Sequence, residues 1–221
     1  SNADPTVVAL TLPYTHKGLF LGKGHKFDII PGIEATYMGI EGGEWKMIYQ
    51  SYLASFQNLF IVSDRYLTSL NLDLRSDNSN LSTSTGDDDS TAIKSKFSWS
   101  NINFLEDKSQ IIVSDLAFTL NNSKGKNSVF NRIDIGVGYV TPFFWDMTFS
   151  TKLSYFHLTY PDNSTGRIDD SVTLSLGLTR KLSELLTGGF MTSYNINGSN
   201  TSANQYKRFN AMFTLTANNL F

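Results

Sequence analysis

The sequence predicts an all-β fold, and three observations support that prediction. Apolar and polar residues alternate along most segments of the 221-residue chain, and no comparable stretch combines helical spacing with caps. The segments are separated by stretches rich in Asn, Ser, Asp and Gly, which are typical of turns and loops. The longest apolar runs, such as 59–62, are far shorter than the roughly 20 residues that a transmembrane helix needs. We therefore expect strands along nearly the whole chain.

The composition narrows the classes of function. A formal net charge of -2 gives no overall attraction to nucleic acid, so we expect no nucleic-acid partner. The chain has no cysteine, which excludes disulfides, thiolate metal sites and cysteine nucleophiles. Charged residues make up 17% of the chain, against roughly 25% in ordinary globular domains. Strands that alternate strictly and carry few charges suggest that only one of the two faces of each strand meets water.

Ten strands are expected from the alternation and from the polar links between segments. Counted along the chain, they are 26–40, 44–54, 58–75, 91–103, 108–120, 128–141, 144–160, 167–182, 186–197 and 206–221. Long links such as 76–90 and 197–205 alternate with short ones such as 182–185, which is typical of an antiparallel up-and-down barrel with unlike ends. Residues 4–25 either add a pair of short strands, for a total of twelve, or form a periplasmic or lumenal segment. Residues 1–3 resemble a remnant of tag cleavage, and residues 26–221 form one barrel.

The polar side of the strands indicates which face meets lipid. Gly136, Gly138 and Gly177 lie on that side together with charges of both signs, which suit a wet, ion-paired interior, and aromatic residues gather near strand ends, as in interfacial girdles. We therefore predict a transmembrane β-barrel with its apolar face in lipid. A soluble barrel that binds a small apolar ligand has the same alternation and stays open as an alternative. The predicted lumen-lining residues are Glu34, Asp73, Arg75, Lys94, Lys96, Asp115, Arg132, Asp134, Asp146 and Lys152.

The last strand carries a resemblance to a known class. Phe209, Phe213, Leu215 and Phe221 share one parity, and Phe221 is the final residue of the sequence. This pattern resembles the C-terminal strand signature of Gram-negative outer-membrane β-barrel proteins, although Asn219 stands where that signature has an apolar residue. The resemblance implies recognition by the barrel assembly machinery, closure of the last strand against the first, and a location among outer-membrane lipid and lipopolysaccharide after removal of a signal peptide. With both termini periplasmic, the strand number would be even.

The sequence contains no recognisable catalytic, metal or cofactor motif, so we expect a non-enzymatic protein. The expected role is a passive channel for small solutes or a structural barrel that presents surface loops; the lumenal charges would then select solutes or brace the wall. A barrel hydrolase of protease or lipase type is the alternative, and it would need an acid–histidine cluster at the extracellular rim. His157 shares its parity with Tyr155 and Leu153, so we expect an outward, interfacial histidine. The oligomeric state stays open.

Overall fold

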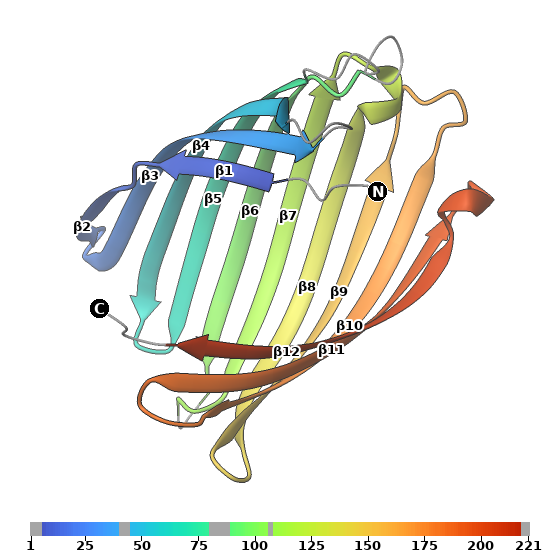
Figure 1. The fold of residues 1–221 in the computed structure, drawn as a ribbon. Coiled ribbons are helices and arrows are strands. Elements are labelled where there is room, and N and C mark those ends of the chain that lie inside the picture. Colours follow the sequence, from blue (N-terminus) through green and yellow to red (C-terminus); the bar gives the residue numbers. More distant parts are fainter. Residues whose placement is uncertain (1–5, 40–44, 80–88, 106–107, 218–221) are drawn as a thin grey trace.

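The computed structural model describes residues 6–39, 45–79, 89–105 and 108–217, and these residues are almost entirely strand (Figure 1). The two helices in these ranges are single 3-10 turns, and neither is long and apolar enough to cross a membrane. The strands are β1 Thr6–Thr11, β2 Tyr14–Phe20, β3 Lys23–Gly39, β4 Trp45–Ser63, β5 Tyr66–Ser79, β6 Ala92–Phe104, β7 Ile111–Ser123, β8 Phe130–Phe143, β9 Met147–Thr159, β10 Ile168–Lys181, β11 Leu186–Ser199 and β12 Tyr206–Ala217.

All twelve strands belong to one antiparallel sheet, and from β3 to β12 each strand pairs with the next along the chain. The first two strands share one neighbour: β1 pairs with the later part of β3 and β2 with its earlier part. Between them Leu12 and Pro13 interrupt the ladder, because proline has no N–H to donate, although the Leu12 N–H still reaches the Pro31 carbonyl at 3.0 Å. The sheet therefore has twelve strands in eleven positions, one shared by β1 and β2 and ten for β3 to β12.

The all-β, up-and-down prediction is confirmed, and the strand count is the alternative of twelve rather than ten. One predicted boundary was wrong: the link expected at 55–57 lies inside β4, and the turn falls at Asp64 and Arg65. A second turn, expected between the strands 128–141 and 144–160, lies at 144–146, where Trp145 and Asp146 have positive φ angles of 58° and 57°. Asp146 therefore occupies a turn and not the lumenal side of a strand, which corrects its assignment.

Most of the turns and loops separate by length, as predicted. The links at 21–22, 64–65, 144–146 and 182–185 lie at one end of the sheet, and the longer links at 124–129, 160–167 and 200–205 lie at the other. We call these the short-turn end and the long-loop end. Because the number of positions is odd, β1 begins at the long-loop end whereas β12 ends at the short-turn end (Figure 1). The twelve strands thus fill an odd number of positions, so the start of β1 and the end of β12 lie at opposite ends of the sheet, unlike the two periplasmic termini that were expected.

The two edges of the curled sheet are β1 with β2 and, on the other side, β12 (Figure 1). In the described residues no hydrogen-bonded ladder joins β12 to β1 or β2, so the expected closure of the last strand against the first is absent there. The two edges run in the same direction, since eleven alternating positions give the first and the last the same sense. Antiparallel pairing between them is therefore impossible, and a direct closure would have to be parallel.

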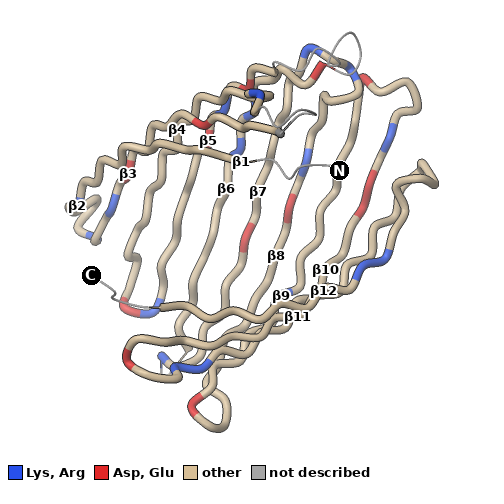
Figure 2. Tube along the Cα trace, in the orientation of Figure 1, with Lys and Arg blue, Asp and Glu red and all other residues tan. Residues whose placement is uncertain are grey.

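The outer face of the sheet is apolar and the inner face is polar. On β8 the outward residues Ile133, Ile135 and Val137 are exposed, Val137 to 54%, whereas the inward Gly136 and Gly138 are buried. The same division holds on β5, β7 and β10. Charged positions are sparse along the strands, and many lie near turns (Figure 2). The apolar residues thus form the surface of the fold and not its core, as the sequence predicted for a barrel that faces lipid.

Candidate functional site

The inner face of the sheet is the candidate functional surface. Nine of the ten predicted lumen-lining residues lie on strands with their side chains on this face: Glu34 on β3, Asp73 and Arg75 on β5, Lys94 and Lys96 on β6, Asp115 on β7, Arg132 and Asp134 on β8, and Lys152 on β9. The tenth, Asp146, lies in the turn described above. Side chains of one parity on neighbouring strands share a face, which is why residues far apart in sequence meet here.

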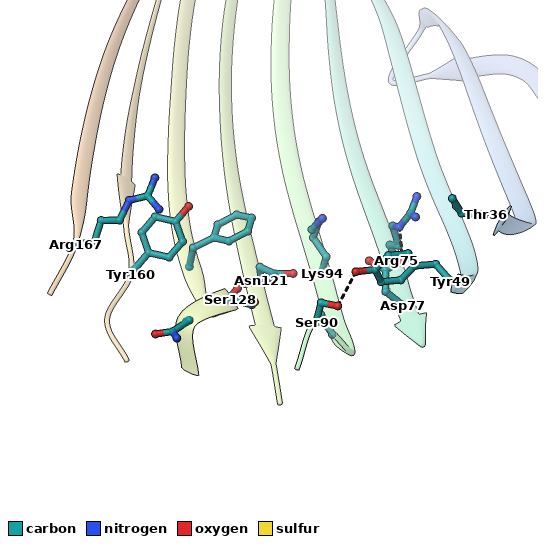
Figure 3. Close-up of a pocket in the computed structure, with 13 residues that line it drawn as sticks. Thr36, Tyr49, Arg75, Asp77, Ser90, Lys94, Asn121, Ser128, Tyr160 and Arg167 are labelled. Atoms are coloured by element: carbon teal, nitrogen blue, oxygen red, sulfur yellow. Dashed lines mark hydrogen bonds and ion pairs between the residues drawn. The ribbon is translucent and has the colours of Figure 1, made fainter. Parts of the chain in front are cut away.

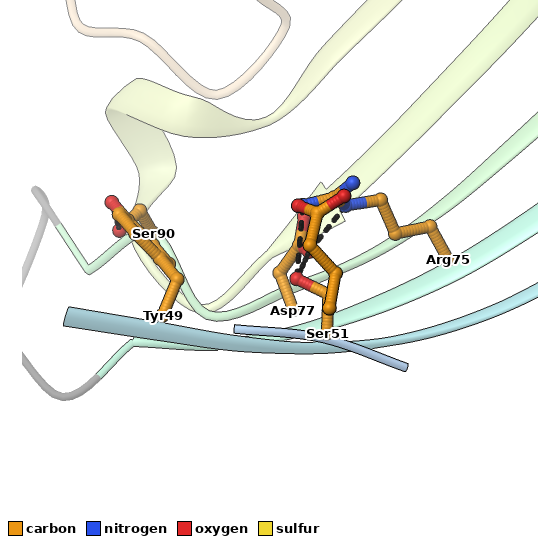
Figure 4. Close-up of polar contacts among 6 residues, drawn as sticks. Tyr49, Ser51, Arg75, Asp77 and Ser90 are labelled. Atoms are coloured by element: carbon orange, nitrogen blue, oxygen red, sulfur yellow. Dashed lines mark hydrogen bonds and ion pairs between the residues drawn. The ribbon is translucent and has the colours of Figure 1, made fainter. Parts of the chain in front are cut away.

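Arg75 joins three strands near the long-loop end of the inner face. Its guanidinium donates to Glu34 at 2.7 Å, to Asp77 at 2.5 Å and to the Ser51 hydroxyl at 2.9 Å. The Ser51 hydroxyl in turn donates to Asp77 at 2.6 Å, and Ser51 is only 1% exposed (Figure 4). The buried Ser51 hydroxyl is satisfied, because it donates one hydrogen bond and accepts another, and the cluster holds β3, β4 and β5 in register. Close by, Tyr49 and Ser90 share a hydrogen bond of 2.7 Å.

Ser51 and Asp77 were not among the predicted residues. Asp77 continues the inward parity of Asp73 and Arg75, but the polar stretch from residue 76 onward was interpreted as a loop. The signal for Asp77 was therefore present and was hidden by the misplaced strand end. Nothing in the sequence distinguishes Ser51 from the other serines, because its role depends on the cross-strand register that places it opposite Asp77.

A second ion pair crosses a whole strand. Lys152 of β9 contacts Asp115 of β7 at 2.5 Å, and the Ser100 hydroxyl donates to the same carboxylate at 2.8 Å. The intervening strand β8 presents Gly136, where an added Cβ would meet the Lys152 side chain at 3.0 Å and the Asp115 carboxylate at 3.3 Å. Glycine is therefore needed for the close approach of these two side chains.

Arg132 and Asp134 form a third pair, two residues apart on the inward side of β8. The guanidinium also lies 4.2 Å from the centre of the Phe156 ring on β9, within the range of a cation–π contact. Phe156 is one of the few aromatic residues on the inner face. Arg132 is thus held by the Asp134 carboxylate and by the Phe156 ring, which together keep its side chain against the inner face.

Among the cavities along this wall, two are lined by most of its charged residues. One of about 420 Å³, near the long-loop end, is lined by Arg75, Asp77, Lys94, Asn121, Tyr160, Arg167 and neighbouring residues (Figure 3). Another of about 600 Å³ is lined by Lys94, Lys96, Asp115, Arg132, Asp134 and Lys152 among others. At the rim, burial raises the pKa of Tyr160, and the hydrogen bond to Asp169 raises the pKa of Arg167. Both groups therefore keep their ordinary charge at neutral pH, Tyr160 neutral and Arg167 positive.

His157 lies on the outer face, as its parity predicted. Its Nδ1 is 2.8 Å from the Asp170 carboxylate, and the Tyr155 hydroxyl donates to that carboxylate at 2.5 Å. Within the described residues no serine hydroxyl hydrogen-bonds to His157, so the nucleophile of a lipase-like triad is missing from this cluster. The described residues also contain no group of three or more His, Asp or Glu side chains arranged to hold a metal ion.

The predicted assembly signal is described in part. Phe209, Phe213 and Leu215 lie on the outward side of β12, and Phe213 is 81% exposed with its ring centre 4.8 Å from that of Phe190. Phe221 lies outside the described residues. An aromatic ladder on the outer face is what a lipid-facing last strand requires.

Comparison with known proteins agrees with this geometry at the level of the fold. No protein-family model matches the chain, and no curated protein matches it. Among solved structures, the chain is similar to in-vitro folded OmpT, an outer-membrane protein of Vibrio cholerae, in its trimer form, with a TM-score of 0.51 and 8% identity over 96% of this chain and 98% of that one. A second structure of the same OmpT gives a TM-score of 0.46 at 8% identity, over 96% of this chain and 92% of that one. A loop L8 deletion mutant of OmpT gives 0.46 at 9% identity, over 96% and 99%. The chain has the fold of an outer-membrane β-barrel protein.

Proposed function

We propose that this protein is an integral β-barrel of a bacterial outer membrane, without enzymatic activity, and that its lumen passes small hydrophilic solutes. The observation that carries the proposal is the division of the two faces. The outer face is apolar and exposed, while the inner face is lined by charges, hydroxyls and cavities of about 420 and 600 Å³. Volumes of this order suit small solutes.

The outer face supports a membrane location. A sheet-wide apolar surface in water would be an aggregation liability, whereas in a bilayer the same surface contacts lipid chains. We place the long-loop end outside the cell, against lipopolysaccharide, and the short-turn end in the periplasm, because outer-membrane barrels have long extracellular loops and short periplasmic turns. Delivery by the barrel assembly machinery is supported by the outward ladder of Phe209, Phe213 and Leu215.

A solute pathway requires a closed wall, and so does the bilayer itself. Each unpaired backbone group in hydrocarbon costs several kcal/mol, so the free edges of β1, β2 and β12 have to be joined in the membrane. Parallel pairing of the two edges would close an odd-numbered barrel, an arrangement that exists in some membrane barrels. This closure is part of the proposal.

A conductance measurement in planar bilayers tests the proposal. The protein is first purified in detergent and compared with and without heating on a gel, because a folded barrel migrates differently when unheated. Stepwise currents after insertion support a channel, provided that a heat-denatured sample of the same preparation gives none. A silent bilayer with demonstrably folded protein contradicts the channel. Monodisperse protein in buffer without detergent contradicts the membrane location and favours the soluble barrel.

The second candidate is a structural barrel that presents its loops, and the ion pairs favour it. The Arg75 cluster ties β3, β4 and β5 together, and the pair of Lys152 and Asp115 spans β8, so each braces the wall as well as lining it. Folded but non-conducting protein is the result that this candidate predicts. The conductance measurement therefore separates the two functions directly.

A further inference from the structure

Lys94 and Lys96 differ from the other cations among the predicted lumen-lining residues. The other inner-face cations named above have a carboxylate partner: Arg75, Arg132 and Lys152 lie within 2.7 Å of one. In the part of the chain that the structure describes, no carboxylate lies within 4.0 Å of the ammonium group of Lys94 or of Lys96. The ammonium nitrogen of Lys94 instead lies 5.9 Å from the centre of the Phe130 ring, within the range of a cation–π contact.

The neighbouring strands explain why these two lysines stay without a counter-ion. Lys94 pairs across the ladder with Arg75 on one side and with Asn121 on the other, and Lys96 lies between Asp73 and Thr119. Like charges directly opposite each other in a sheet are unfavourable, so Lys94 gains nothing from its charged neighbour. Asp73, the one acidic neighbour, accepts the Ser55 hydroxyl at 2.5 Å instead.

The remaining carboxylates of the wall are already engaged. Glu34 and Asp77 hold Arg75, while Asp115 holds Lys152 and the Ser100 hydroxyl. Rearranging any of them toward β6 would break an existing contact. The two ammonium groups, two residues apart on one face of β6, are thus positive charges of this wall that have no ion-pair partner among the described residues.

Both lysines are open to a solute in the lumen. Lys94 lines the cavities of about 420 and 600 Å³ and a third of about 380 Å³, and Lys96 lines the last two. Lys94 therefore lines three neighbouring cavities. Figure 3 shows it between Arg75 and Asn121 in the cavity of about 420 Å³. A solute that moves along the wall passes this pair.

We propose that Lys94 and Lys96 form a binding site for a small oxyanion, a carboxylate or a phosphate, on the lumenal wall, and that this site makes the pore prefer anions. The second part rests on the proposed channel function, whereas the first does not. Lysine is suited to the task because its compact charge and rotatable donors attract an anion without the fixed two-point geometry of arginine. Weak attraction of this kind lets a solute enter and leave again, which conduction requires.

Two measurements on the full chain test the proposal. The first is the reversal potential in a planar bilayer under a tenfold KCl gradient, for the wild type and for a Lys94→Gln/Lys96→Gln double variant. We expect an anion-preferring wild type and a fall of at least about fivefold in the anion-to-cation permeability ratio for the variant, because a single unit charge near 4 Å in a water-like medium already changes the local anion concentration by about that factor. Lys207→Gln is the matched control, because Lys207 carries the same charge on the outward side of β12.

The second measurement is titration calorimetry of detergent-solubilised protein with inorganic phosphate and, separately, with acetate. We expect saturable binding heat for the wild type and the Lys207→Gln control, and its loss in the double variant; the two ligands show whether phosphate or carboxylate binds better. Unheated gel migration verifies that each variant is folded. Anion binding without conductance would uphold the site and overturn the channel. Conductance with unchanged selectivity and no binding heat would uphold the channel and overturn the site.

Discussion

The assignment of the apolar face to lipid makes a quantitative prediction for Val137→Arg. Val137 is the eighth of the 14 residues of β8, its side chain points outward, and it is 54% exposed. At a tilt of about 45° a strand rises about 2.4 Å per residue along the membrane normal, so β8 spans about 34 Å and Val137 lies about 1 Å from its centre. Arginine on the lipid face near the midplane costs about 2–4 kcal/mol. In water the same substitution at an exposed site costs no more than about 0.5 kcal/mol.

The assay is urea unfolding in lipid vesicles, with the folded fraction taken from unheated gel migration. A cost of about 2–4 kcal/mol lowers the folding equilibrium constant by a factor of about 30 to 1,000. Ser98→Arg is the matched control, because Ser98 lies on the inner face of β6 and lines the cavity of about 600 Å³, where a guanidinium can stay hydrated. If Val137→Arg leaves the folding equilibrium constant unchanged and Ser98→Arg lowers it, the assignment of the apolar face to lipid is refuted. That result would mean that the outer face meets water.

Three further predictions follow from the strand directions and the inner-face contacts. Because the chain has no cysteine, Thr6→Cys at the long-loop end and Ser183→Cys at the short-turn end can be labelled singly. A membrane-impermeant maleimide should label the first in intact cells and the second only after permeabilisation, and the reverse result would invert the orientation. Asp115→Asn should lower the free energy of unfolding by no more than about 1 kcal/mol, because the side chains of Lys152 and Asp115 are 50% and 30% exposed and the pair is partly screened; a much larger loss in urea titrations would show that the wall is drier than proposed. Phe213→Asn should reduce the amount of folded protein in outer-membrane fractions while in-vitro folding persists, and equal yields would argue against a role in assembly.

Much of the fold could be predicted because strand patterning is local. Side chains alternate between two faces with a period of two, so the positions of Ile133, Ile135 and Val137 on one side follow from the sequence alone. The small and charged residues on the other side indicated that it was the interior. Strand ends were less predictable: the turn at Asp64 and Arg65 was placed too early, since both sides of it carry the same alternation.

The contacts of the candidate site could be predicted only as a shared face. Parity placed Asp115 and Lys152 on the inner side, but their contact depends on a diagonal approach over Gly136 that requires the registers of β7, β8 and β9. Lys94 likewise lacks an ion pair because the register places Arg75, and not an acidic residue, opposite it across the ladder.

The sequence by itself determined that the chain forms strands and which residues share a face, because both depend on neighbours within a few residues. It favoured an outward apolar face but left the inverse arrangement of a soluble barrel open. The tertiary structure alone decided the eleven positions, the common direction of the two edges, and the partners of each inner-face charge. The physical reason is that alternation repeats every two residues whatever the register is. Long-range backbone hydrogen bonds choose the register, and a shift of two residues would leave every face unchanged while exchanging the ion pairs that cross strands, such as Arg75 with Glu34 and Lys152 with Asp115.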